Sequence, residues 1–297
     1  MRGIKFAFLG IALLALSAFG GAQLLNFTTG YSFTDIVNQY YASDYGWHGN
    51  QMVNSTRAVY TGAVSADNYI YNAVNWSIQT GDDPLSNGSN RDEFNDMFGT
   101  AQLDESAASG TQYYAVATYI PSTWIDPAGG SQWFIVDQLH PADSNTGHSA
   151  QAVFQFLFAS SLLPAEHYGL RTVGGPITGG GTVPSADDVV TDLGPLVFNT
   201  EVDWVFKVTW GSDVDGGYNE AVYKKVIGKD NQFNLIASYA TPNLYSVSGV
   251  DQTTFYWKRG IYRGDNGTQG TAYYYAGPFV RATTMRDAEL GAFGHYP

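Results

Sequence analysis

The chain has no cysteine among its 297 residues. Disulfide bonds are therefore excluded as a source of stability, and a hydrophobic core must hold the fold together. The 21 Tyr, 17 Phe and 7 Trp residues can supply that core. Without cysteine, and without a cluster of histidines, the sequence also lacks the kind of ligand set that binds zinc.

Basic residues are scarce. Lys and Arg number 14 against 27 Asp and Glu, which gives a formal net charge of −13 at pH 7. We therefore expect no nucleic-acid partner, because binding nucleic acid requires a basic surface. The charge also counts against a very dense polyanion as ligand, unless a local basic cleft overrides the overall field.

Long apolar runs are missing except at the N-terminus. The stretch from Phe6 to Ala18 is almost wholly apolar, follows Arg2 and Lys5, and precedes a small-residue site that ends at Ala22. This pattern predicts a signal peptide over residues 1–22, cleaved near Ala22, and an uncleaved anchor is the alternative. We expect a secreted, extracellular protein with no membrane span after cleavage.

The remaining chain, residues 23–297, is predicted to form a single domain and a monomer. Five glycosylation sequons fit an exported protein, and they begin at Asn26, Asn54, Asn75, Asn87 and Asn266. Each would be glycosylated only where the source cell has the machinery.

Long stretches of helical periodicity and internal repeats are also missing. Short β-rich stretches recur instead, at residues 58–60, 73–78, 113–120, 132–140, 153–158, 204–210, 220–226, 254–262 and 273–281. Many short strands predict an all-β fold, a β-sandwich of the jelly-roll, concanavalin-like type with a concave substrate groove. The Gly-, Pro- and Thr-rich residues 172–195 are predicted to form a long loop.

The strand from Phe255 to Arg263 attracts most interest. Its side chains alternate, with Phe255, Trp257, Arg259 and Ile261 on one face and Tyr256, Lys258, Gly260 and Tyr262 on the other. A Lys and a Tyr then share a face, with open space above the glycine between them. Such a face could floor a groove for an acidic sugar, and an ordinary amphipathic strand is the alternative.

A second candidate pair is Gln138 and His140, two positions apart in a predicted strand and hence on one face. A carboxamide and an imidazole side by side could hold a carboxylate and move a proton. The alternative is that His140 only ends the strand before Pro141. The other histidines are interpreted as surface or loop residues, namely His48, His148, His167 and His295.

Two further features involve charged residues near turns. Arg91 begins a predicted strand and could bind an anion through two of its guanidinium N–H groups, or simply form a salt bridge with Glu93 or another acid. The oxygen-rich turn with Asp213 and Asp215 suggests a calcium loop, but it lacks the spacing of an EF-hand, so an ordinary hairpin turn is favoured. No cofactor is otherwise expected.

Several catalytic patterns are missing. There is no Gly-Xaa-Ser-Xaa-Gly elbow and no phosphate-binding loop. A glycoside hydrolase would need two carboxylates flanking the bond, and the nearest candidates are Glu201 and Asp203 at a strand start.

The candidate residues lie in segments that resemble those of jelly-roll polysaccharide lyases, nearest to the heparin lyase I and glucuronan lyase group, with alginate lyases more distant. Gln138-Leu139-His140 resembles their Gln-Ile-His element, Tyr256 to Arg263 resembles their Tyr-Phe-Lys-Xaa-Gly-Xaa-Tyr strand, and Arg91 to Phe94 resembles their Arg-Xaa-Glu strand. The three occur in the family's order, and the likeness spans roughly residues 55 to 285. Trp257 and Leu139 depart from the usual residues.

The resemblance implies β-elimination at a 4-linked uronic acid of an acidic polysaccharide. Arg91 and Gln138 would neutralise the sugar carboxylate, Tyr262 would be the acid, and either His140 or Tyr262 the base. A tyrosine base would require a lowered pKa, which Lys258 and a nearby arginine could provide.

Substrate binding is implied for Lys258, Tyr256 and Arg263, although alternation turns Arg259 and Arg263 away from Lys258. A weakly charged polyuronate such as glucuronan or alginate suits an acidic protein better than sulfated heparin does. A non-catalytic carbohydrate-binding or structural cell-surface protein on a lectin-like sandwich is the alternative, because one fold hosts many functions.

Overall fold

The computed structural model describes residues 22–25, 51–52, 58–62, 73–82, 89–95, 109–124, 133–141, 152–177, 188–214, 216–251, 255–264, 270–277 and 279–293. The predicted signal peptide lies outside these residues except for Ala22, which begins the first strand. The sequons at Asn26, Asn54, Asn87 and Asn266 also lie outside them. No helix in the described part of the chain is long and apolar enough to cross a membrane.

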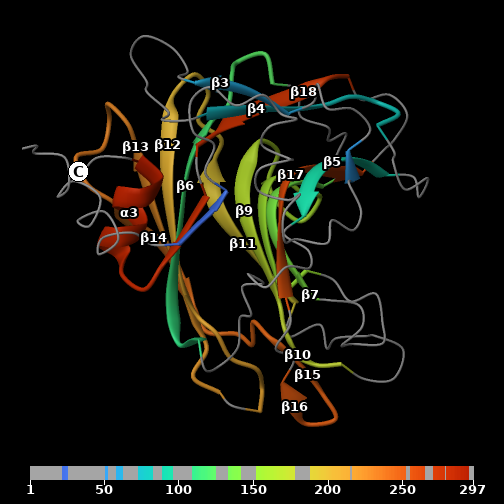
Figure 1. Ribbon diagram of the computed structural model, residues 1–297, viewed down its shortest axis with the longest axis vertical. Helices are drawn as coiled ribbons and strands as arrows, with labels where there is room; N and C mark the ends of the chain where they lie inside the picture. Colours follow the sequence, from blue (N-terminus) through green and yellow to red (C-terminus); the bar gives the residue numbers. More distant parts are fainter. Residues whose placement is uncertain are drawn as a thin grey trace, which may run out of the picture.

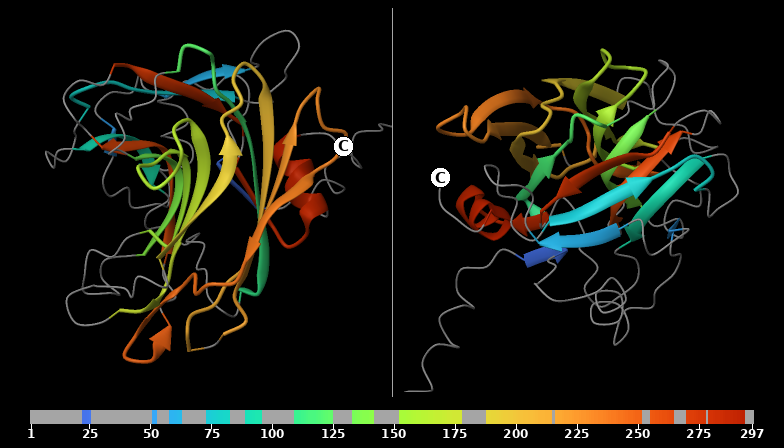
Figure 2. Two further views of the ribbon diagram at one scale, coloured as in Figure 1. Left: turned by 180° about the vertical axis from the view of Figure 1, so that it is seen from behind. Right: turned by 90° about the horizontal axis from the view of Figure 1, so that it is seen from above.

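Two antiparallel sheets face each other (Figures 1 and 2). The first sheet runs in the order β14-β13-β12-β6-β18-β4-β3, with β19 also pairing with β6 and β1. Its strands are β1 (Ala22–Leu25), β3 (Ala58–Gly62), β4 (Ala73–Ile78), β6 (Thr111–Tyr119), β12 (Glu201–Thr209), β13 (Asn219–Val226), β14 (Asn234–Tyr239), β18 (Ala272–Ala276) and β19 (Phe279–Ala282).

The second sheet runs in the order β11-β9-β8-β7-β17-β5-β2. Its strands are β2 (Gln51–Met52), β5 (Ser89–Asn95), β7 (Phe134–Pro141), β8 (Phe154–Ala159), β9 (His167–Val173), β11 (Asp188–Pro195) and β17 (Phe255–Gly264). A small third sheet joins β10 (Gly175–Pro176), β15 (Tyr245–Val247) and β16 (Val250–Asp251). The predicted all-β sandwich is confirmed.

Aromatic residues fill the space between the two large sheets. Trp257 on β17 lies 5.0 Å from Tyr114 and 4.7 Å from Phe279, measured between ring centroids, and both partners come from the first sheet. It also meets Phe154 on β8 edge to face at 5.4 Å. Such pairs add to the free energy gained by burying the rings. Trp257, at the position where the resembled strand has Phe, therefore takes part in the packing between the two sheets.

A short helix, α3 (Met285–Phe293), covers the outer face of the first sheet (Figure 1). Thr284 caps it, since its Oγ1 accepts a hydrogen bond of 3.1 Å from the Asp287 backbone N–H. Ala288, Ala292 and Phe293 pack against a second apolar cluster of that sheet. The absence of long helical periodicity left this helix unpredicted.

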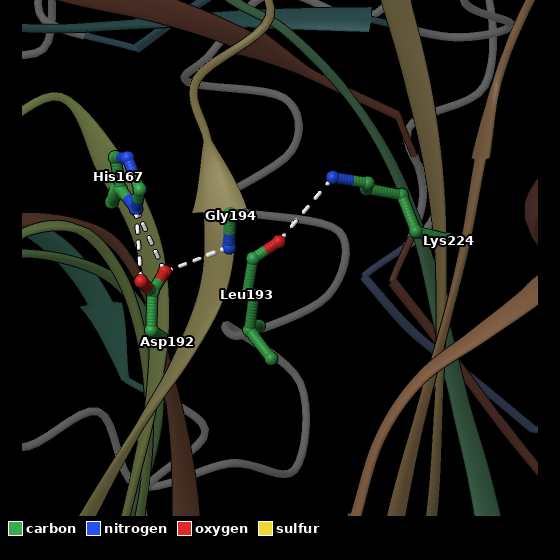
Figure 3. A network of polar contacts seen from close by, with 5 residues as sticks. All are labelled: His167, Asp192, Leu193, Gly194 and Lys224. Atoms are coloured by element: carbon green, nitrogen blue, oxygen red, sulfur yellow. Dashed lines mark hydrogen bonds and ion pairs between the residues drawn. The ribbon is translucent and has the colours of Figure 1, made fainter.

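The prediction of a long loop over residues 172–195 is wrong at both of its ends, and residues 178–187 lie outside the described residues. β9 extends to Val173, β11 begins at Asp188, and the two strands pair antiparallel. His167, interpreted as a surface or loop residue, begins β9 and keeps a partly exposed side chain. Its Nδ1 lies 2.9 Å from Asp192 Oδ1 on β11 (Figure 3). On β11, the carbonyl of Leu193 accepts a hydrogen bond from Lys224 Nζ at 3.3 Å, which connects β11 to β13 of the opposite sheet.

Candidate active site

One cleft of about 380 Å³ lies on the face of the second sheet that is turned away from the core. The alternation of the strands sets this arrangement, because Leu139 and Trp257 join the core while Gln138, His140 and Lys258 line the cleft. The lining residues come from five adjacent strands and the segments flanking them, and they are Arg91, Trp133, Ile135, Gln138, His140, Ala152, Gln155, Leu157, Ser160, Ser161, Leu162, Arg171, Lys258 and Tyr262. The structure thus brings together five of the predicted residues, namely Arg91, Gln138, His140, Lys258 and Tyr262.

Two rows of cleft residues run across the strands. In the first row, Lys258 pairs in register with Gln138, which pairs with Gln155, which pairs with Arg171. In the second row, the register partners in order are Arg91, Tyr262, Ile135 and Leu157. Polar and charged side chains therefore fill the first row, while the second row changes from polar on β5 and β17 to apolar on β7 and β8.

The two rows converge from β17 towards β8. They stand four positions apart on β17 (Lys258 and Tyr262), three on β7 (Gln138 and Ile135) and two on β8 (Gln155 and Leu157). The pairing register shifts between these strands, and such shifts redirect the side chains of a strand. Gly260, with a φ of 139°, lies between Arg259 and Tyr262, where the register of β17 shifts, and a residue with a side chain would be strained there.

His140 is held in its neutral form, with one ring nitrogen unprotonated. Its Nδ1 lies 2.8 Å from the carbonyl oxygen of Pro141. A carbonyl can only accept a hydrogen bond, so in the neutral ring Nδ1 carries the hydrogen and Nε2 carries the lone pair. Burial first, then the positive charge of Lys258, lower the pKa of His140 to about 3, and Arg91 contributes in the same direction. The imidazole is therefore neutral at physiological pH.

Glu93 supports the two groups expected to bind a carboxylate. Its Oε1 accepts a hydrogen bond of 2.5 Å from Gln138 Nε2, and its Oε2 lies 3.7 Å from Arg91 Nη1. The Glu93 side chain is only 2 % exposed, so it lies below the cleft surface rather than in it. One hydrogen of the Gln138 amide is thereby committed to Glu93, and the other remains for a ligand. The ion pair between Arg91 and Glu93, predicted as the alternative role of Arg91, is confirmed. Glu93 also orients Gln138 through its hydrogen bond.

Tyr262 contacts both a cation and an indole. The Arg91 guanidinium carbon stands 3.8 Å from the centroid of the Tyr262 ring, within the range of a cation–π contact. Trp133 also meets the ring edge to face, with centroids 5.7 Å apart. These contacts hold the Tyr262 ring in place and keep the Arg91 guanidinium beside it.

Two predicted cations lie elsewhere. Arg263 is fully buried, donates from Nε to Asn90 Oδ1 and from Nη2 to the Gly270 carbonyl, and does not line the cleft. Arg259 is also buried and lies 3.5 Å from Asp137 Oδ1. Both follow the alternation that turns them away from Lys258. The backbone of Tyr256 pairs with His140, but its side chain lies outside the described residues.

Sequence reasoning missed Gln155, Arg171 and Trp133 as cleft residues. Gln155 and Arg171 come from β8 and β9, and no local pattern shows that these strands lie in register with Gln138. Trp133 falls inside the predicted strand 132–140, but it lies just before β7 (Phe134–Pro141) and is 37 % exposed, so the strand pattern gave no signal for its place in the cleft.

The candidate carboxylate pair for hydrolysis lies on the opposite sheet. Glu201 and Asp203 are buried on β12 beneath α3, away from the cleft. The Asp213 turn joins the paired strands β12 and β13, as a hairpin turn should, and Asp213 accepts a hydrogen bond from Ser246. Asp215 lies outside the described residues. Within the described ranges, no group of three or more His, Asp or Glu side chains is placed to hold a metal ion.

The cleft therefore combines a neutral imidazole, a tyrosine hydroxyl and the basic side chains of Arg91, Arg171 and Lys258 on one face of a β-sandwich. Such a set is able to transfer protons beside a bound anion.

The chain belongs to the polysaccharide lyase family, whose model matches residues 43–276. Among solved structures it is similar to an endo-β-1,4-glucuronan lyase from the fungus Trichoderma reesei, with a TM-score of 0.57, 13 % identity, and coverage of 84 % of this chain and 94 % of that one. It is also similar to an alginate lyase from Pseudomonas aeruginosa, with a TM-score of 0.44, 14 % identity, and coverage of 83 % and 87 %. No curated protein sequence matches the chain.

The protein is thus a polysaccharide lyase with the jelly-roll fold, and its substrate is a polysaccharide. The resemblance inferred from the three sequence elements is confirmed at the level of the family and the fold.

Proposed function

We propose that the protein cleaves a 4-linked, uronic-acid-containing polysaccharide by β-elimination. The observation that carries this proposal is the neutral His140, with its lone pair on Nε2, in the same cleft as Arg91, Gln138 and Tyr262. A hydrolase would use a pair of carboxylates instead, and the described lining of the cleft contains no Asp or Glu.

In the proposed reaction, Arg91 and the free amide hydrogen of Gln138 bind the sugar carboxylate. Their charge and dipole stabilise the negative charge that develops when the C5 proton leaves. His140 Nε2 takes that proton, the electron pair forms the C4–C5 double bond, and the C4–O4 bond breaks. The Tyr262 hydroxyl gives its proton to the departing O4. A syn arrangement of proton and leaving group would instead make Tyr262 both base and acid.

The substrate is proposed to be a weakly charged polyuronate of the glucuronan or alginate type. The chain is acidic overall, so capture of a polyanion depends on the cleft, where Arg91, Lys258 and Arg171 gather. A sulfated chain would carry far more negative charge into the field of the whole protein. Lys258 is proposed to bind the acid and to keep His140 neutral.

To test the proposal, purified protein is incubated with glucuronan, alginate, heparin, heparan sulfate or pectate. Formation of unsaturated ends is followed by ultraviolet absorbance. We expect absorbance to rise with a polyuronate, and Tyr262→Phe and His140→Ala to abolish the rise while the fold survives. Matched controls are Tyr223→Phe, on the opposite sheet, and His167→Ala, outside the cleft lining.

Lyase activity of wild-type strength in Tyr262→Phe would refute the assignment of the acid. Depletion of polysaccharide from solution without a rise in absorbance would indicate a binding protein, and new reducing ends without unsaturation would indicate hydrolysis.

We also propose that the protein is exported through its N-terminal leader. The support is the sequence pattern alone: two basic residues, an apolar run and a small-residue site ending at Ala22. N-terminal sequencing of protein recovered from culture medium should give a chain that begins near Gln23. A chain that keeps residues 1–22 in a membrane fraction would show an anchor instead.

A further inference from the structure

Arg171 lies in the cleft but far from the residues assigned to the reaction. It stands in the register row of Lys258, Gln138 and Gln155, on the fourth of four adjacent strands. Strands in a sheet are about 4.8 Å apart, so the backbones of Arg171 and Lys258 are separated by roughly 14 Å across the sheet. That span exceeds one sugar ring, so Arg171 and Lys258 would meet different sugars of one bound chain.

Asp188 holds Arg171 in a fixed orientation. Arg171 Nε donates to Asp188 Oδ1 at 2.8 Å, and its Nη2 donates to Oδ2 at 2.7 Å. This fork occupies one edge of the planar guanidinium and leaves the edge formed by Nη1 and the second hydrogen of Nη2. Arg171 lines the cleft and Asp188 does not, so the second edge is the part that a ligand can reach.

Gln155 lies between Arg171 and Gln138 in the row and is also held in place. Its Nε2 donates to the carbonyl of Ala152 at 3.2 Å, which turns the amide oxygen the other way. An oriented acceptor beside an oriented cation suits a sugar that carries both a hydroxyl and a carboxylate. The row thus repeats, with Gln155 one strand and Arg171 two strands away from Gln138, the pairing of an amide with a cation that Gln138 and Arg91 provide.

We propose that Arg171 and Gln155 form a second acid-binding subsite, which selects chains carrying a uronate on a sugar other than the one being cleaved. This inference rests on the proposed function and narrows it to a polyuronate of successive acidic sugars that lies across the strands. Arg171 binds and positions the chain and takes no part in the proton transfers.

The experiment compares wild type with Arg171→Gln, which keeps hydrogen-bonding capacity but removes the charge and the fork. Substrates are polyuronate and its oligomers of increasing length. We expect KM to rise about tenfold on the polymer, as for loss of one charge-assisted contact, with kcat within twofold. The difference should vanish on oligomers too short to reach from Gln138 to Arg171. Arg171→Lys keeps the charge and should recover part of the affinity.

Lys229→Gln removes the same charge from an exposed turn outside the cleft and should change nothing. Calorimetric binding of a long oligouronate to Tyr262→Phe, with and without Arg171→Gln, tests the subsite without turnover. An unchanged KM and unchanged binding would overturn the subsite, as would an equal loss on the shortest cleaved oligomer, since that indicates a general disturbance. A wild-type protein that binds through Arg171 yet forms no unsaturated ends would overturn the proposed reaction and leave the subsite standing.

Discussion

The pKa of His140 is the most direct test of how the cleft works. The change from 6.5 to about 3 corresponds to roughly 5 kcal/mol against the charged ring, at about 1.4 kcal/mol per pKa unit. A base with an ordinary pKa would be about 90 % protonated at pH 5.5 and would lose roughly tenfold in rate. With the lowered pKa, less than about 1 % of His140 is protonated at that pH.

Two measurements follow from this difference. The profile of kcat/KM, which reports on the free enzyme, should show no acidic limb attributable to histidine between pH 7 and 5. In parallel, the nuclear magnetic resonance signal of the His140 ring, assigned by its loss in His140→Gln, should not shift over the same range. A ring that titrates near pH 6.5 would refute the account of His140 as a desolvated neutral base.

A substitution of Lys258 tests what lowers the pKa of His140. Its charge is the second largest contribution to the lowered pKa of His140. Lys258→Gln should therefore raise that pKa and move the ring signal towards an observable titration, whatever the variant does to substrate binding. Lys229→Gln, which removes a charge from an exposed turn, should leave the signal unchanged. An unshifted His140 in Lys258→Gln would show that burial alone sets the pKa.

Two further predictions concern stability. Burial and the neighbouring Asp203 raise the pKa of Glu201, so the folded protein keeps a proton that the unfolded chain releases above about pH 4.5. The free energy of unfolding should thus fall as pH rises from 5 to 8, by up to about 1.4 kcal/mol per pH unit. Urea titrations of Glu201→Gln should show a smaller fall in this free energy with pH. An unaltered fall would contradict the raised pKa of Glu201. Arg259→Met leaves Asp137 buried without its counterion and should lower the free energy of unfolding by about 3 kcal/mol at pH 8. Adding Asp137→Leu to the same chain should restore most of that loss. A loss below about 1 kcal/mol in Arg259→Met would argue against a stabilising ion pair.

The fold was predictable where strands alternate strongly. The strand Ala73–Ile78 was predicted with the bounds that the structure has, because its buried and half-buried residues follow the period of a strand. β11 was missed because it is an edge strand with mostly half-buried positions and a composition typical of loops. The helix Met285–Phe293 was too short to produce a clear periodic signal.

The site was predictable within a strand but not across strands. Gln138 with His140, and Lys258 with Tyr262, share a face because of the two-residue period, and the cleft contains all four. Register between strands depends on pairing and bulges, so nothing local could show that Arg171 stands in line with Gln138. The predicted binding role of Arg263 conflicted with the alternation, and the alternation decided where its side chain lies.

The uneven spacing of the two cleft rows has a consequence for how relatives of this chain should differ. Because β7 advances by three positions between Ile135 and Gln138, both intervening residues, Val136 and Asp137, are buried on the core side of the strand. Asp137 then faces its register partner Arg259 in the interior. A relative with the same step in β7 should change positions 137 and 259 together, to an apolar pair or to another ion pair, and one with regular alternation would need neither. Correlated change at these two positions, both outside the cleft, would therefore mark which relatives share this geometry of the cleft.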